Sequence, residues 1–145
     1  ADNSALLALY AGVGVTLGHN FPFYLHFKGG KGIACLAGIL STMDLRIMVT
    51  CFLVFSVTVG ITKYVSLGSI LVSIVFFAEL VYFGSQGSYR VTEACFPEFC
   101  VLGAALMLMA IWRHRANIKR LIAGTENKLG AKKKPSQETD SHSTK

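Results

Sequence analysis

Three long apolar stretches, at residues 45–62, 64–84 and 96–112, constrain the fold of this 145-residue chain more than any other feature. Each is about as long as an α-helix that crosses a hydrocarbon core of ~30 Å at ~1.5 Å per residue. Two shorter apolar stretches precede them, at 5–17 and 33–43. Backbone groups inside lipid must find hydrogen bonds within their own segment, which favours helices. We therefore predict an all-α, polytopic integral membrane protein.

The apolar stretches predict about five membrane-embedded helices. The stretch at 33–43 is short and covers only roughly half of the hydrocarbon core. It is either a half-helix buried among its neighbours or a helix that begins at Lys31 in a locally thinned bilayer. We expect residues 1–130 to form the membrane-embedded domain. We expect 131–145 to form a disordered basic and polar tail, because the sequence from Lys132 has no apolar residues to bury.

Positive charge is unevenly distributed along the chain. Eight of the 14 Lys and Arg residues lie between Arg113 and Lys134. If the chain starts outside and crosses the bilayer five times, the inner loops hold this cluster together with Lys28, Lys31 and Lys63. An excess of Lys and Arg is typical of the cytoplasmic side, so we predict a cytoplasmic C-terminus. Three polar segments then share that face: 18–32, 62–69 and 113–130. A basic cluster at a helix end fits anionic lipid better than nucleic acid, for which no base-reading motif is present.

The segment 18–32 combines cations with a flexible backbone. Its glycines would let backbone N–H groups approach an anion closely, and its lysines add positive charge. These residues are Gly29, Gly30, Gly32, Lys28 and Lys31. A loop of this kind before a helix start favours a phosphate site, with simple anchoring to anionic headgroups as the alternative. His19 either donates to the phosphate or caps the end of a helix.

The segment 113–126 predicts a helix that continues out of the membrane. At about 100° per residue, His114, Asn117 and Arg120 fall on one face. An imidazole, a carboxamide and a guanidinium together can hold a phosphate and orient a hydroxyl group. Glu126 follows the predicted helix end and can position a neighbouring cation. The alternative is a solvated basic helix end, which explains Arg and Lys but not His and Asn.

Ser66 and Ser69 lie in the first turns of the predicted helix 64–84. Serines at such positions usually act as helix caps, and contact with a ligand is the alternative. None of the four cysteines forms a CxxC pair, so we interpret them as small buried side chains.

Three strings carry a resemblance to a known family: GHNFPFYLHFKGGKGIA, TKYVSLGSI and HRANIKRLIAGTENKLG. The order Gly-His-x-x-Pro, Phe-Lys-Gly-Gly-Lys-Gly, Ser-Leu-x-Ser and His-Arg-x-Asn-Ile-x-Arg-Leu with Gly-x-Glu resembles the bacterial acyl-phosphate glycerol-3-phosphate acyltransferases. The resemblance covers roughly residues 1–130. It implies transfer of a fatty acyl group from acyl phosphate to sn-glycerol 3-phosphate. The products would be 1-acylglycerol 3-phosphate (lysophosphatidate) and phosphate, in the first step of phospholipid synthesis.

The resemblance also implies where the enzyme works and with what. It implies a multi-pass protein of the bacterial inner membrane that needs no cofactor and no metal. Its partners would be acyl phosphate, glycerol 3-phosphate, the lipid bilayer and the soluble enzyme that produces acyl phosphate. The implied catalytic residues are His114 and Asn117. The implied substrate-binding residues are His19, Lys28, Gly29, Gly30, Lys31, Gly32, Ser66, Ser69, Arg115, Arg120 and Glu126. An acyl phosphate already carries a good leaving group, so positioning and charge stabilisation suffice without a nucleophilic residue.

Two alternatives stay open at this point. Family members carry an earlier loop rich in Gly, Ser, Thr and Asn that ends in Arg, and no such string precedes Gly18. We therefore expect that the chain lacks the N-terminal portion of the family, and an inactive truncated member is one alternative. The other is a small membrane transporter of phosphorylated solutes, which would hold its binding groups near the bilayer midplane.

Overall fold

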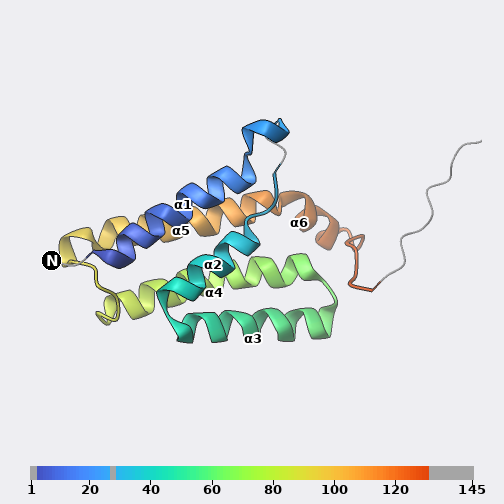
Figure 1. Ribbon diagram of the computed structural model, residues 1–145. Coiled ribbons are helices and arrows are strands. Elements are labelled where there is room, and N and C mark those ends of the chain that lie inside the picture. Colours follow the sequence, from blue (N-terminus) through green and yellow to red (C-terminus); the bar gives the residue numbers. More distant parts are fainter. Residues whose placement is uncertain (1–2, 27–28, 131–145) are drawn as a thin grey trace, which may run out of the picture.

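The computed structural model describes residues 3–26 and 29–130, and these residues form helices joined by short turns (Figure 1). The helices are α1 (Ser4–Asn20), η1 (Phe23–Leu25), α2 (Ile33–Met43), α3 (Leu45–Thr62), α4 (Val65–Ser85), η2 (Glu93–Cys95), α5 (Phe96–Arg113) and α6 (Arg115–Ile122). The described residues contain no strand, so the predicted all-α fold class is confirmed. The predicted tail at 131–145 lies outside the described residues, as does Lys28.

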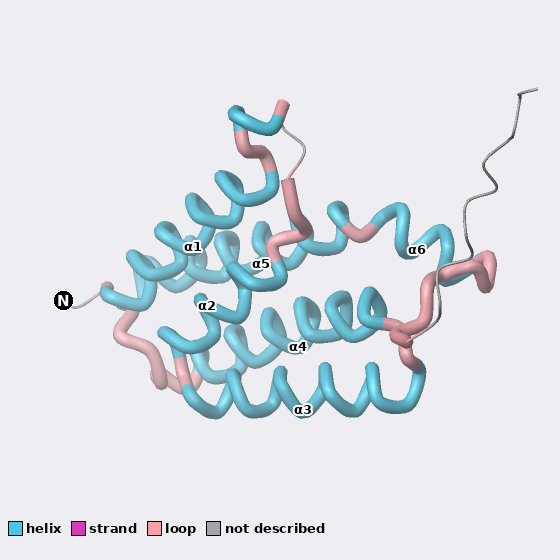
Figure 2. The backbone as a smooth tube through the Cα atoms, turned by 45° about the vertical axis from the view of Figure 1, so that its right-hand side comes forward, coloured by secondary structure: helices cyan, strands magenta, loops and turns pink. Residues whose placement is uncertain are grey.

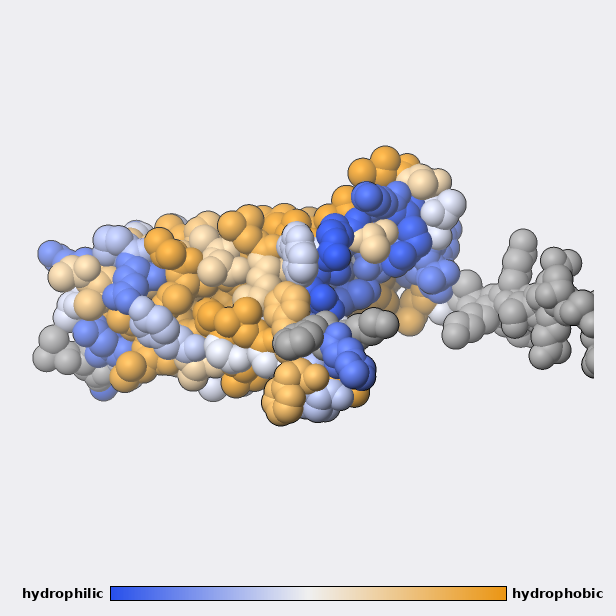
Figure 3. Space-filling model, turned by 90° about the horizontal axis from the view of Figure 1, so that it is seen from above, coloured by the Kyte–Doolittle hydropathy of each residue, from blue (hydrophilic) through white to orange (hydrophobic). Residues whose placement is uncertain are grey.

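The helices match the five apolar stretches within a few residues. Among the described residues, three helical segments are long and apolar enough to cross a membrane: Leu45–Thr62, Val65–Ser85 and Glu93–Arg113. The 17 residues of α1 and the 11 residues of α2 form shorter apolar helices. Figure 3 shows a broad apolar surface over the middle of the molecule, with hydrophilic side chains at both ends. This distribution is typical of a protein that spans a bilayer.

Consecutive long helices run in opposite directions, as Figures 1 and 2 show. In both views α4 lies between α3 and α5, while α1 lies along α5 and α2. The interior is filled by apolar side chains from α1, α2, α3, α4 and α5. The completely buried ones include Leu9, Ile47, Phe76, Leu80 and Phe99. Lipid tails are as apolar as this core, so close packing rather than exclusion of water holds these helices together.

Two local breaks position the helix ends that matter for the site. Lys63 adopts a left-handed conformation (φ 62°) and ends α3, and only Tyr64 separates it from α4. His114 (φ −92°, ψ 4°) interrupts the path from α5 to α6, and its backbone N–H still donates to Ala110 O at 3.1 Å. The first break reverses the chain, and the second changes the phase of the helix without reversing it.

Because the helices alternate in direction, the three polar segments 18–32, 62–69 and 113–126 meet at one end of the bundle. The end of α1, the start of α2, the α3–α4 turn and α6 all lie on the right-hand side of Figure 1. The described parts of the predicted segments 18–32, 62–69 and 113–130 therefore lie at one end of the bundle, while the cytoplasmic orientation of that end stays a prediction. We call this the site end, and we call the opposite end, which holds the start of α1 and the α4–α5 link, the far end.

Candidate active site

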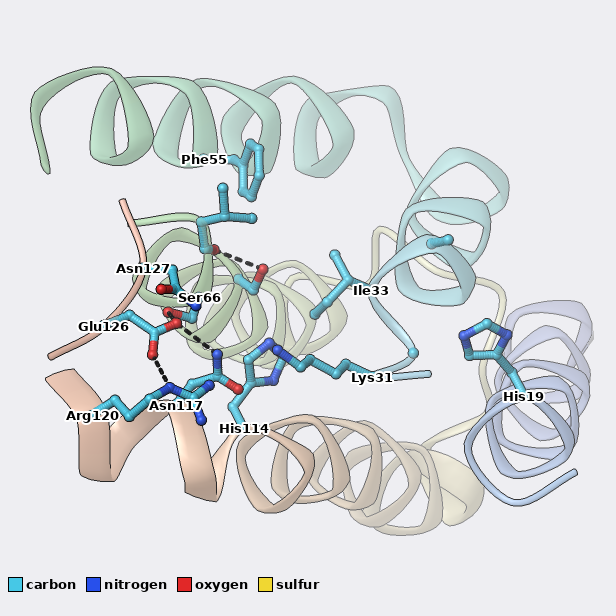
Figure 4. A pocket seen from close by; sticks show the side chains of 14 residues that line it. His19, Lys31, Ile33, Phe55, Ser66, His114, Asn117, Arg120, Glu126 and Asn127 are labelled. Atoms are coloured by element: carbon cyan, nitrogen blue, oxygen red, sulfur yellow. Dashed lines mark hydrogen bonds and ion pairs between the residues drawn. The ribbon is translucent and has the colours of Figure 1, made fainter. Parts of the chain in front are cut away.

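A cavity of about 570 Å³ opens at the site end (Figure 4). Its wall draws on α1, the turn before α2, the start of α2, α3, α4, the α5–α6 break, α6 and the segment after α6. The lining residues are His19, Lys31, Gly32, Ile33, Ala34, Phe55, Val65, Ser66, Ser69, His114, Asn117, Arg120, Glu126 and Asn127. They include both predicted catalytic residues and most of the predicted substrate-binding residues. Residues from all three polar segments thus surround one space.

Glu126 is the centre of a hydrogen-bond network in this cavity. Its carboxylate accepts from Ser66 Oγ at 2.9 Å, from Asn117 Nδ2 at 2.7 Å and from Arg120 Nε at 2.7 Å. The side chain is only 6% exposed. Burial acts to raise the pKa of Glu126, but these hydrogen bonds together hold it below its ordinary value. Glu126 is therefore ionised at neutral pH and fixes the three side chains around it.

The network also decides what Asn117 offers to a ligand. Its Nδ2 is committed to Glu126, so its Oδ1 is the atom left to accept a hydrogen bond. The segment that carries Glu126 is itself tied down, because Leu129 N donates to Lys63 O at 2.7 Å. This bond links the chain after α6 to the α3–α4 turn. Asn117 is therefore oriented by residues on three different parts of the chain.

His114 is almost completely buried, with 1% of its surface exposed. Its Nδ1 lies 2.8 Å from Ala110 O. A carbonyl oxygen only accepts, so Nδ1 carries the proton and Nε2 is left as an acceptor in the neutral ring. Burial lowers the pKa of His114, and the nearby charge of Lys31 lowers it further. The ring is therefore a neutral base at pH 7.

Lys31 supplies a cation close to this base. Figure 4 shows its side chain extending toward His114, while His19 lies on the other side of the cavity, away from the Glu126 network. Loss of water around the Lys31 ammonium lowers its pKa, an effect that Arg120 and Arg113 reinforce and Glu126 opposes. A cation with incomplete hydration and like-charged neighbours attracts an anion strongly.

The glycine turn before α2 is held by a residue that the sequence analysis did not assign to the site. Arg113 donates from Nη2 to Gly29 O at 2.7 Å, and from Nε and Nη2 to Gly30 O at 3.0 and 2.8 Å. Gly30 N also donates to His19 O at 3.2 Å. Gly29 and Gly30 are not part of the cavity wall. They brace Lys31 and Gly32, which are.

The need for glycine at position 29 is steric. A Cβ atom there would overlap with His19 O and would lie 2.6 Å from Asn20 O, and neither backbone atom can move away easily. Gly32 has φ 78°, which favours glycine, and it is the N-cap residue directly before α2. The glycines thus allow close packing of the turn against α1, besides any approach of their amides to an anion.

Arg115 requires a correction, because it does not line the cavity. Its side chain is exposed, its Nη1 donates to Trp112 O at 3.1 Å, and its guanidinium lies 4.2 Å from the centre of the Trp112 ring. It projects from the opposite face of α6 to Asn117. Ser69 does line the cavity, but its hydroxyl donates to Val65 O at 2.9 Å within α4.

A second, apolar cavity of about 400 Å³ adjoins the first between α2, α3 and α4. It is lined by Ile33, Leu36, Ala37, Leu40, Met48, Cys51, Phe52, Phe55 and Val72. Ile33 and Phe55 belong to the walls of both cavities. The polar site therefore adjoins an apolar groove between helices, with Ile33 and Phe55 forming part of both walls. Among the described residues, no three His, Cys, Asp or Glu side chains gather in a way that could hold a metal ion.

Known proteins share this sequence and this arrangement of helices. The family model described as "Glycerol-3-phosphate acyltransferase" matches residues 3–124. A glycerol-3-phosphate acyltransferase of Clostridioides difficile (strain 630) is 41% identical over 138 residues, covering 88% of this chain and 58% of the relative. Another from Shouchella clausii (strain KSM-K16) is 38% identical over 127 residues, covering 88% and 59%. The chain thus spans about 60% of the length of the curated relatives it matches.

Solved structures agree with the sequence comparison. The crystal structure of PlsY (YgiH), an integral membrane glycerol 3-phosphate acyltransferase, in its glycerol 3-phosphate form has a TM-score of 0.65 and 29% identity. That match covers 88% of this chain and 64% of the other. The lysophosphatidic acid form of PlsY has the same TM-score and 30% identity. Together with the apolar helices, these matches make this chain a multi-pass membrane protein that belongs to the glycerol-3-phosphate acyltransferase family.

Proposed function

We propose that this protein transfers a fatty acyl group from acyl phosphate to sn-glycerol 3-phosphate at the cytoplasmic face of a bacterial inner membrane. The products are 1-acylglycerol 3-phosphate and inorganic phosphate. One observation supports the proposal: a polar cavity with excess positive charge adjoins an apolar groove, and Ile33 and Phe55 belong to the walls of both. Both substrates carry phosphate, and one of them also carries a long apolar chain. The two adjoining cavities match this pair of requirements.

The polar cavity supports the roles of its residues. Lys31 and Arg120 attract the phosphate groups, and the amides at the start of α2 add hydrogen-bond donors. Asn117 Oδ1 and His114 Nε2 are both acceptors, so they suit the reacting hydroxyl of glycerol 3-phosphate. The hydroxyl oxygen forms a bond with the acyl carbon, and the bond from that carbon to the phosphate oxygen breaks. The hydroxyl proton passes to His114 Nε2 or to an oxygen of the leaving phosphate.

The reaction needs no nucleophilic residue under this proposal. The acyl phosphate is already activated, so catalysis rests on holding the two substrates together and stabilising negative charge. His114 acts as the base because it is buried, neutral and oriented by Ala110 O. Glu126 is a positioning residue, since it orients Asn117 and Arg120 and its own oxygens are occupied.

The apolar groove supports a place for the acyl chain along α2 and α3, open to lipid. From Ile33 to Leu40 along α2 the groove wall runs for about 10 Å, at ~1.5 Å per residue. Ala37 is exposed at its edge. We expect Ala37→Phe to narrow the groove, so that kcat/KM falls several-fold for palmitoyl phosphate and less for octanoyl phosphate. Steady-state rates with the two donors measure this, and equal losses would remove the groove from the acyl site.

A transporter of phosphorylated solutes is disfavoured by the position of the polar groups. The cavity lies at the end of the helices, next to the α3–α4 turn, whereas transporters bind solutes near the middle of their spans. The cytoplasmic orientation of the site end and of the C-terminus is supported by its Lys and Arg residues. A soluble enzyme that delivers acyl phosphate is a further proposed partner at this face.

The decisive experiment supplies the purified chain, reconstituted in vesicles, with labelled glycerol 3-phosphate and either palmitoyl phosphate or palmitoyl-CoA. We expect labelled 1-acylglycerol 3-phosphate from palmitoyl phosphate only, and no product from the Asn117→Ala variant. Product from palmitoyl-CoA alone would overturn the donor. Absence of product with both donors would overturn the activity for this chain.

A further inference from the structure

Aromatic side chains form an exposed surface at the site end, outside both cavities. The surface comprises Phe23, Tyr24, Leu25, Trp112 and Arg115, and we call it the interfacial rim. Phe23 is 80% exposed, Tyr24 71% and Trp112 49%. None of these five residues lines the polar or the apolar cavity. Large aromatic side chains in such exposed positions indicate contact with something other than water.

Members of the rim contact one another in two pairs, Phe23 with Tyr24 and Trp112 with Arg115. The rings of Phe23 and Tyr24 meet edge to face, with centroids 5.5 Å apart. Phe21, which follows α1, lies 5.9 Å from the Trp112 ring and so joins η1 to the end of α5. The guanidinium of Arg115 lies over the Trp112 ring, 4.2 Å from the ring centre. The rim is thus shared between two parts of the chain that are distant in sequence.

Its level along the bundle matches the boundary between lipid and water. Trp112 is the last residue but one of the apolar segment Glu93–Arg113. In Figures 1 and 2, η1 projects sideways from the bundle near the end of α1, rather than along the helix axes. Trp and Tyr favour the headgroup level of a bilayer, where one part of the ring is apolar and another is hydrated. The surrounding bilayer is therefore the surface that η1 and Trp112 meet.

The charge of the rim favours one kind of headgroup. At the site end, the described residues include seven cations and one carboxylate: Lys31, Lys63, Arg113, Arg115, Lys119, Arg120 and Lys128 against Glu126. Glu126 is occupied by Arg120. No carboxylate among the described residues pairs with Arg115. An exposed guanidinium beside a Trp at the membrane level complements an anionic phosphate group.

We propose that the interfacial rim binds the headgroup layer of the membrane and selects anionic over zwitterionic lipid. This inference does not depend on acyl transfer. It also gives the membrane a route to the glycine turn. Arg113 lies 5.4 Å from the centre of the Phe21 ring and donates to the carbonyls of Gly29 and Gly30. Lipid that fixes Phe21 and Trp112 therefore also fixes the residue that holds the turn.

The chain contains a single tryptophan, so its fluorescence reports on the rim alone. The full chain is reconstituted in equimolar phosphatidylglycerol and phosphatidylcholine, with bromine near the headgroup end of the acyl chains of only one lipid. We expect brominated phosphatidylglycerol to compete for the site beside Trp112 about fivefold better than brominated phosphatidylcholine. This factor corresponds to the roughly 1 kcal/mol that one basic residue contributes at an anionic surface.

Variants identify the residue responsible. Arg115→Gln removes the charge but keeps the tryptophan. We expect the two brominated lipids to quench the fluorescence of this variant equally. Arg115→Lys keeps the charge and should retain the preference. Arg46→Gln, an exposed arginine at the far end, is the matched control and should behave as the wild type. Equal quenching of the wild type by both lipids would overturn the proposal, and so would a preference that survives in Arg115→Gln. Absence of quenching by both lipids would also overturn it, because Trp112 would then face water instead of lipid.

Discussion

The two ends of the bundle are both polar, but they treat their charges differently. At the far end the polar contacts are mostly exposed and balance one another. Asp44 and Arg46 form an ion pair at 2.6 Å, two residues apart, and the carboxylate also caps α3 through Arg46 N. Asn3 Oδ1 accepts from Thr92 N at 3.0 Å and ties the start of α1 to the α4–α5 link. These contacts stabilise helix ends, and the described charges there nearly cancel, with Arg46 and Arg90 against Asp44, Glu93 and Glu98.

At the site end several polar side chains are buried, and the charge is not balanced. His114, Asn117 and Ser66 are each at least 95% buried. One carboxylate, Glu126, holds three of the donors, while Lys31 points into the cavity without a carboxylate partner among the described residues. The comparison teaches that polarity alone does not mark a site in a membrane protein. A site is marked by buried polar groups combined with an uncompensated charge.

The largest expected effect tests the site end directly through activity. Lys31→Ala and Asn117→Ala should each lower kcat/KM for glycerol 3-phosphate by about 100- to 1,000-fold, because each removes a group that positions charge or the reacting hydroxyl. Their far-end counterparts, Arg46→Ala and Asn3→Ala, should stay within about twofold of the wild type. Steady-state rates in vesicles measure all four. A near-normal rate for either site-end variant would remove that residue from the site.

A second comparison concerns stability and uses one carboxylate from each end. Glu126→Gln should lower the free energy of unfolding by about 2 kcal/mol, because buried Asn117 and half-exposed Arg120 lose a charged acceptor. Asp44→Asn should cost less than about 1 kcal/mol, because asparagine caps a helix as well as aspartate and the ion pair is exposed. Denaturant titration of the purified variants measures both. Similar losses at the two ends would contradict a special role for Glu126.

Two glycines sharpen the comparison at the level of the backbone. Gly29→Ala places a Cβ against backbone oxygens, so the turn has to move, and we expect the affinity for glycerol 3-phosphate to fall about tenfold or more. Gly87→Ala at the far end meets open space at φ 69°. It should cost about 1 kcal/mol of stability and leave ligand affinity unchanged. Calorimetric titration distinguishes the two outcomes, and equal affinities for both variants would argue against the brace.

The smallest expected effect is a dependence of stability on pH. Burial lowers the pKa of His114 in the folded chain below the ordinary value of about 6.5. Between these two pKa values the unfolded chain binds more protons than the folded chain, so stability is complete above about pH 6.5 and falls as the pH drops through that window. We expect His114→Gln to show a weaker fall in Tm between about pH 6.5 and 5.

The far end provides the control for this pH experiment. The side-chain hydrogen bond from Arg46 lowers the pKa of Asp44, so this carboxyl stays ionised throughout the same window. Asp44→Asn should therefore keep the pH profile of the wild type in Tm. A profile that is the same for His114→Gln as for the wild type would mean that His114 is not the titrating group.

Much of the fold could be predicted from the sequence because the bilayer leaves few choices. Apolar length and the need to pair backbone groups predict the helices at 45–62 and 64–84 almost to the residue. Alternating direction then brings the three polar segments together. Helical phase correctly groups His114 with Asn117 and Arg120, since His114 lies directly before α6, which carries the other two.

The remaining details depend on tertiary contacts that spacing does not encode. Arg113 lies before the break at His114, where the phase of the helix changes, so projection along α6 cannot show that it turns toward the glycine turn. Arg115 has the same chemistry two residues later but faces Trp112. The role of Glu126 depends on the Leu129–Lys63 bond between segments far apart in the chain. In the sequence Arg113 is one of several basic residues between 113 and 134, and nothing in their spacing distinguishes it from the others.

The wall shared by Ile33 and Phe55 has a consequence for how the proposed reaction would end. A lysophosphatidate made there would have its glycerol phosphate in water and its tail already beside the membrane. The product would be released by lateral diffusion into the leaflet, and its acyl chain would not pass through water. If this release step limited turnover, the rate of the enzyme would depend on the fluidity of the surrounding leaflet.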